Sequence, residues 1–124
     1  MTAPTVLIVD DDLGFIFWLG QHLDEAGLFA LPAKNIPGAL SLITEHKVVP
    51  DVLVVNTALE RAAELIAYVR NLGQCVKIVG LLSQEGEGEA ADVDTSRSRP
   101  AEFTKDAVLE WIRLLQGIVA CKTR

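Results

Sequence analysis

The sequence is poor in cysteine and in basic residues. Its 124 residues include two cysteines, Cys75 and Cys121, and 11 lysines and arginines against 17 aspartates and glutamates. Two cysteines are too few for a disulfide framework, which favours a reducing cytosol as the compartment. The net charge of −6 argues against nucleic acid or an anionic membrane as a direct partner, because both attract clustered lysine and arginine.

Long apolar runs and glycine-rich loops are also missing. No apolar run approaches the roughly 18 residues of a membrane span, and no signal peptide is apparent, so we expect a cytoplasmic protein. Gly80 lies in an apolar run without the G-x-G-x-x-G pattern of a dinucleotide site. Neither His22 nor His46 has a partner at the spacing of a metal site or a catalytic pair. We therefore expect no enzyme.

The bulk composition is that of one globular domain. Half of the residues are hydrophobic and 23% are charged, which excludes a disordered tail. A chain of 124 residues is long enough to bury one sizeable core. We therefore treat residues 1–124 as a single domain.

Strand-like and helix-like segments alternate along the chain. Short continuous apolar runs predict parallel strands that are covered on both faces, and apolar residues at helical spacing predict the helices between them. The segment 83–100 is polar and predicts a loop, with at most a short helix near 89–92 and a poor fifth strand before Pro100. The predicted strands are 6–9, 28–31, 52–55 and 76–82, and the predicted helices are 13–26, 37–46, 62–71 and 101–119.

This alternation predicts an α/β fold with a doubly wound parallel sheet. In such sheets the working site lies beyond the carboxyl ends of the strands. Asp10 and Asp11 follow the first strand, Asn56 follows the apolar run of the third, Ser83 follows the fourth, and Arg99 follows the weak fifth strand. We expect these residues to share one rim of the sheet.

Four stretches, taken together and in order, resemble the landmarks of the bacterial response-regulator receiver domain. They are VLIVDDD from Val6, PDVLVVN from Pro50, VKIVGLLS from Val76 and SRP from Ser98. The resemblance covers about 6–119 and implies the CheY-like, flavodoxin-like fold, with five parallel strands in the order 2-1-3-4-5. It also implies a part in two-component signal transduction and phosphorelay.

The resemblance implies a role for each rim residue. In receiver domains an acidic pair helps to bind Mg²⁺, and here that pair is Asp10 and Asp11. An aspartate that ends the third strand accepts phosphate from a histidine kinase, and the residue at this position is Asn56. The hydroxyl and the cation that respond to the phosphoryl group correspond to Ser83 and Arg99.

Asn56 is the departure with the largest chemical consequence. An amide oxygen is not a nucleophile that forms an acyl phosphate, so we expect no phosphorylation at the usual position. Arg99 replaces a lysine, and Ser96 stands where receiver domains usually carry an aromatic switch residue. Only fifteen residues separate Ser83 from Arg99, which predicts a reduced fourth helix. The sequence is identified as an atypical receiver, or pseudo-receiver.

The acidic pair has two interpretations. One is residual binding of Mg²⁺, which two carboxylates with a neutral third ligand would hold weakly or not at all. The other, which we favour, is that Asp10 and Asp11 form ion pairs with Arg99 and cap the first helix. The rim would then stay in one arrangement. No other cofactor is expected.

Two helices carry candidate partner surfaces. Helical spacing places Trp18 on the side of the first helix opposite Ile16 and Leu19, and we predict that it contacts a partner. In receiver domains this helix docks kinases and phosphotransfer proteins. The last helix has a wide apolar stripe that Leu114 and Ile118 extend. The stripe is consistent with a homodimer surface, with the seat of a downstream domain, or with ordinary surface leucines.

Three functions stay open. The leading one is an interaction module whose partner is a histidine kinase, a phosphotransfer protein or an output domain. The second is a flavin-binding or other small-ligand domain on the same fold, although no glycine-rich phosphate loop supports it. The third is a receiver that is phosphorylated at another rim residue, with Asp10, Asp11 or Ser83 as the acceptor.

Overall fold

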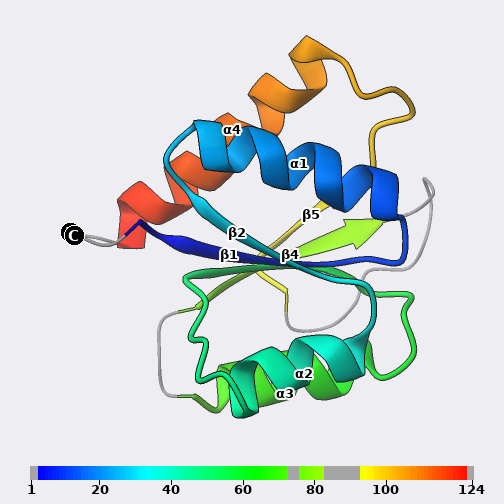
Figure 1. Cartoon of the computed structure of the whole chain (residues 1–124), viewed down its shortest axis with the longest axis vertical. Helices are drawn as coiled ribbons and strands as arrows, with labels where there is room; N and C mark the ends of the chain where they lie inside the picture. Colours follow the sequence, from blue (N-terminus) through cyan, green and yellow to red (C-terminus); the bar gives the residue numbers. More distant parts are fainter. Residues whose placement is uncertain (1–2, 73–75, 83–92, 123–124) are drawn as a thin grey trace.

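Five parallel strands form one sheet with helices on both faces (Figure 1). The computed structural model describes residues 3–72, 76–82 and 93–122. The elements are β1 (Thr5–Val9), α1 (Leu13–Glu25), β2 (Phe29–Ala33), α2 (Ile36–Thr44), β3 (Val52–Asn56), α3 (Ala62–Arg70), β4 (Lys77–Leu82), β5 (Thr95–Ser98) and α4 (Lys105–Lys122). The strand order is β2-β1-β3-β4-β5, which confirms the predicted doubly wound fold.

Local capping sets the ends of the helices. Asp12 begins α1, because its Oδ1 accepts the N–H of the residue three positions later at 3.1 Å. Gly27 follows α1 with a φ of +88°, a conformation that favours glycine. The last helix begins at Lys105, four residues later than predicted. Thr104 is the reason, because its hydroxyl oxygen accepts the N–H of Ala107 at 3.1 Å.

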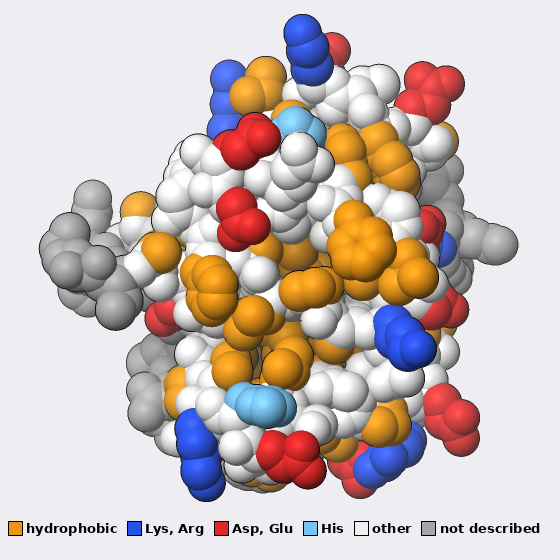
Figure 2. Space-filling view, viewed as in Figure 1, with side chains coloured by type: hydrophobic (Ala, Val, Ile, Leu, Met, Phe, Trp, Pro, Cys, Tyr) orange, Lys and Arg blue, Asp and Glu red, His pale blue; other side chains and the backbone are white. Residues whose placement is uncertain are grey.

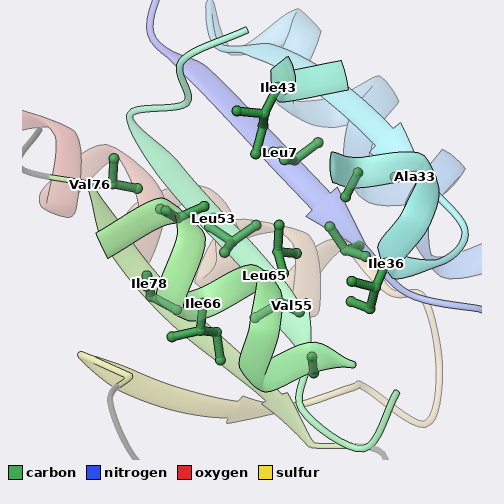
Figure 3. Close-up of a cluster of buried hydrophobic side chains, with 14 residues drawn as sticks. Leu7, Ala33, Ile36, Ile43, Leu53, Val55, Leu65, Ile66, Val76 and Ile78 are labelled. Carbon is green, nitrogen blue, oxygen red and sulfur yellow. The ribbon is translucent and has the colours of Figure 1, made fainter. Parts of the chain in front are cut away.

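The core consists of one apolar cluster on each face of the sheet. The α2 and α3 side holds Leu7, Leu53 and Leu65, which point towards one another between the helices and the strands (Figure 3). The α1 and α4 side holds Ile8, Phe15 and Leu115, which are also fully buried. Alternate residues of β1 to β4 enter opposite clusters. Each large buried side chain stabilises the fold by about 1.5–3 kcal/mol.

Several sequence predictions lie outside the described residues. They are the helix-ending glycine at 73, Ser83, the short helix near 89–92 and the reduced fourth helix. The weak fifth strand is confirmed as β5. None of the helices in the described part of the chain is long and apolar enough to cross a membrane.

Candidate functional site

Asp10, Asn56 and Arg99 meet at the carboxyl ends of the strands. The register pairs Val9 with Val55, so that Asp10, the residue after β1, lies beside Asn56, the last residue of β3. Arg99 follows β5 directly, and its N–H donates to the carbonyl of Leu82 at 2.9 Å. Sheet topology therefore brings together three side chains that are far apart in the sequence.

The carboxylate of Asp10 is fully buried, and both of its oxygens accept hydrogen bonds. Oδ1 accepts the Asn56 Nδ2 amide at 3.0 Å and the backbone N–H of Asp11 at 2.9 Å. Oδ2 accepts the Arg99 Nη1 at 2.8 Å. A buried charge needs this kind of complete pairing, because an unpaired one would be strongly destabilising.

Arg99 is the cation of the rim. Besides its ion pair with Asp10, its Nη1 lies 3.6 Å from Asp12 Oδ2 and 3.9 Å from Asp11 Oδ1. The predicted pairing between the acidic residues and Arg99 is thus present in the structure, and it includes a third aspartate. Asp12 caps the first helix, which confirms its prediction from the sequence as the residue that caps the helix 13–26, whereas the cap predicted for the Asp10–Asp11 pair is not formed.

Asn56 presents a donor to the rim. Its Oδ1 accepts the backbone N–H of Ala58 at 2.9 Å, while its Nδ2 donates to Asp10. Only 3% of Asn56 is exposed to solvent. The amide therefore turns its oxygen towards the backbone of the β3–α3 loop and its N–H towards Asp10.

Burial raises the pKa of Asp10 above its ordinary value of 3.8. The hydrogen bond from Asn56 and the charge of Arg99 act in the opposite direction, and burial outweighs them. The raised pKa means that the loss of hydration destabilises the ionised form of Asp10 more than the hydrogen bonds and the charge of Arg99 stabilise it. Arg99 is consequently important for keeping this carboxylate ionised.

The rim does not fit a divalent cation in this arrangement. Mg²⁺ requires several oxygen ligands with free lone pairs. Both oxygens of Asp10 already accept hydrogen bonds, one of them from the side-chain N–H of Asn56. The positively charged guanidinium of Arg99 lies among the carboxylates, where it would repel a cation. Asp11 is the most exposed carboxylate of the three, with 68% of its side chain exposed against 42% for Asp12. Within residues 3–72, 76–82 and 93–122, no group of three or more His, Cys, Asp or Glu side chains could hold a metal ion.

Of the two serines that the sequence compares with receiver-domain positions, the structure places only Ser96. Ser83 lies outside the described residues, so the structure does not place it. Ser96, at the predicted aromatic-switch position, lies in β5 opposite Gly80 of β4. A Cβ added to Gly80 would approach the Ser96 Oγ to 3.3 Å. The small side chain of Ser96 therefore packs closely against the backbone of Gly80, at the position where receiver domains usually carry an aromatic ring.

Trp18 is half-buried and stacks on Phe103. The ring centroids are 4.8 Å apart with an interplanar angle of 19°, and Phe15 and His22 also contact the Trp18 ring. Trp18 packs against the cluster between α1 and α4, so the prediction that it projects away from the core is wrong. The loop before α4 brings Phe103 over it, a contact that the periodicity of α1 cannot show.

Two further aromatic residues near Trp18 are exposed. Phe17 of α1 is 61% exposed, and Phe103 is 44% exposed. A signal for Phe103 was available, because an apolar residue directly before a capping threonine often packs against the start of the helix. Because Phe103 is partly exposed, its stack with Trp18 presents an aromatic surface to solvent.

The last helix buries more of its apolar stripe than predicted. Leu114 and Ile118 are half-buried and pack against the cluster under α4. Three cations, Lys77, Arg97 and Arg113, and one acid, Glu110, line the hollows around Leu114. The apolar surface that α4 leaves open beside Leu114 is therefore bordered mainly by cations.

The fold is that of solved receiver domains. No family model matches the sequence, and a comparison with curated proteins gives no match. Among solved structures, the chain is similar to a response regulator from Thermotoga maritima, with a TM-score of 0.76, 18% identity and coverage of 95% of this chain and 98% of the other. It is also similar to the chemotaxis response regulator CheY4 of Vibrio cholerae, with a TM-score of 0.72, 21% identity and coverage of 94% and 99%. A third similar structure is a two-component response regulator from Clostridium difficile, with a TM-score of 0.76, 18% identity and coverage of 94% of this chain and 96% of the other.

Proposed function

We propose that this chain is a signal-transduction module that binds another protein and is not phosphorylated at position 56. The observation that carries the proposal is the buried amide of Asn56, which donates to Asp10 at 3.0 Å. Acyl-phosphate formation requires a carboxylate oxygen with a free lone pair at this position. The amide offers neither the charge nor an oxygen that faces the rim.

The rim of this module works as a fixed scaffold. Arg99 and Asn56 satisfy the Asp10 carboxylate from two sides. Disruption of a buried pair of this kind costs about 3–5 kcal/mol, so the rim holds one arrangement without a covalent signal. Such a module signals through the protein surfaces that it offers to a partner, and not through a change at the rim.

The aromatic surface of α1 is the proposed contact for a partner. Trp18 and Phe103 form a stacked pair, of which Phe103 is 44% exposed. Rigid aromatic side chains at a surface often anchor protein interfaces. We assign the module to the cytoplasm, with a histidine kinase, a phosphotransfer protein or an output domain as the partner class.

A capture experiment with and without phosphoryl groups tests this function. The full chain is immobilised and exposed to a lysate of the source cells that has been treated with phosphatase and EDTA. A specific protein should be retained by the wild-type chain and lost with Trp18→Ala. The matched control is Tyr68→Ala, which removes an exposed aromatic ring from α3. Retention that requires Mg²⁺ and a phosphoryl donor would contradict the proposal.

The alternative functions have separate tests. If the rim accepted phosphate elsewhere, Asp11 would be the described carboxylate open to a donor, because Asp10 is buried and hydrogen-bonded. Peptide mapping after incubation with a phosphoryl donor would locate such a modification. A flavin domain would show visible absorbance in the purified protein, and a colourless preparation rejects that version.

A further inference from the structure

An exposed apolar patch lies along the edge of the sheet at β2. Phe17 of α1 is 61% exposed and Phe29 of β2 is 51% exposed, and Pro32 is exposed while Leu31 is half-buried. These four residues are called the β2-edge patch. Figure 2 shows hydrophobic side chains gathered over this side of the molecule, between the regions of α1 and α2. Exposed apolar groups that gather in this way on a soluble domain mark an interaction surface.

The outer edge of β2 is poor in free N–H donors. In a parallel pair alternate residues turn their N–H groups to the neighbouring strand, and Phe29 N–H donates to Pro4 at 2.7 Å on the β1 side. The outward positions are therefore Ala30 and Pro32. The N–H of Ala30 donates to Asp24 Oδ1 at 3.3 Å, and proline has no N–H. The edge therefore disfavours an added strand and favours a partner that binds through side chains.

Side chains of opposite charge lie at the two ends of β2. Asp24 lies at the start of β2, where its carboxylate binds Ala30, and Lys34 follows the end of β2. The four residues of the patch carry no charge between them. A two-fold axis across the middle of β2 would place Asp24 of each copy near Lys34 of the other. An isologous interface requires this self-complementarity.

We propose that two copies of this chain pair through the β2-edge patch, with the Phe17 and Phe29 rings in the apolar centre and Asp24 opposite Lys34 at each end. The proposal does not depend on the function assigned to the rim.

Sedimentation equilibrium of the full chain tests the proposal. Over about 1–200 μM, a range that detects micromolar dissociation constants, the wild-type mass should approach twice the 13.4 kDa of the chain. Phe17→Glu and Phe29→Glu should each raise the dissociation constant at least about tenfold. Leu109→Glu, a matched change at an exposed leucine of α4, should leave it unchanged. Circular dichroism melting verifies that each variant folds.

A charge exchange identifies the two-fold arrangement. Lys34→Glu should weaken the dimer, and the double variant Lys34→Glu with Asp24→Lys should recover it. A wild-type chain that stays monomeric over the whole range would overturn the proposal. A dimer that survives Phe17→Glu and Phe29→Glu but is lost with Leu109→Glu would also overturn it.

Discussion

The side-chain amide of Asn56 donates a hydrogen bond to the buried carboxylate of Asp10 over 3.0 Å. The other oxygen of that carboxylate accepts Arg99 at 2.8 Å. A neutral amide and a side-chain cation, both supplied by the polypeptide, thus satisfy the charge at the centre of the rim. Changes to any of the three residues should therefore act through the pairing of Asp10.

Asn56→Asp should destabilise the chain at neutral pH. The new carboxylate would lie beside Asp10 and replace a donor with a second negative charge. We expect a loss of about 1–3 kcal/mol in the free energy of unfolding, measured with urea. Millimolar Mg²⁺ should recover part of this loss in the variant and leave the wild type unchanged. Equal stabilisation of both proteins by Mg²⁺ would show that the native rim binds the metal.

Arg99→Met should cost much more than an equivalent change nearby. It keeps a long side chain but leaves Asp10 buried without its cation, for which the expected loss is about 3–5 kcal/mol. Arg97→Met, on the exposed part of β5, is the matched control and should change stability by less than about 0.5 kcal/mol. Similar losses in both variants would contradict the role given to Arg99.

The raised pKa of Asp10 predicts a particular pH dependence. Burial is its main cause, so between pH 3.8 and the raised pKa the folded state binds more protons than the unfolded state. The contribution of Asp10 to stability is therefore complete below pH 3.8 and is lost as the pH rises through the raised pKa.

The comparison with Asp10→Asn isolates this effect, because an amide does not titrate. The stability of the wild type minus that of the variant should fall as the pH rises from about 3.5 to 7 in urea titrations. A difference that grows with pH would mean that Arg99 and Asn56 outweigh burial.

The stack of Trp18 on Phe103 should stabilise the position of the loop before α4. Its rings are 4.8 Å apart, and aromatic pairs of this kind contribute about 0.5–1.5 kcal/mol beyond their burial. A double-mutant cycle with Trp18→Ala and Phe103→Ala should give a coupling energy in this range. Additive effects would show that the two rings act independently.

The fold could be predicted from the sequence because its signals are local. Continuous apolar runs marked β1 and β3, and the rule that parallel strands end at the same edge of the sheet placed Asp10 and Asn56 at one rim. The bounds of α4 could not be predicted in the same way, because the hydroxyl of Thr104 competes with the apolar period for the start of the helix. Local hydrogen bonds of this kind often move a helix end by several residues.

The aromatic surface could be predicted only in part. Helical spacing placed Trp18 on the side of α1 away from the core, whereas its ring packs against the core cluster and on Phe103, which arrives from a distant loop. The inclusion of Asp12 in the pairing with Arg99 was missed for a similar reason, since it depends on how the side chain of Arg99 crosses the rim. Side-chain contacts between segments that are distant in the sequence cannot be predicted from helix or strand periodicity.

The intact mass of the wild-type chain after incubation with acetyl phosphate and Mg²⁺ addresses the chemistry of the rim directly. Asn56→Asp, which places a carboxylate at the third-strand position, is treated in parallel as the comparison. The buried amide and the paired Asp10 predict an unchanged mass for the wild type. A gain of about 80 Da on the wild-type chain, the mass of one phosphoryl group, would contradict the proposed function.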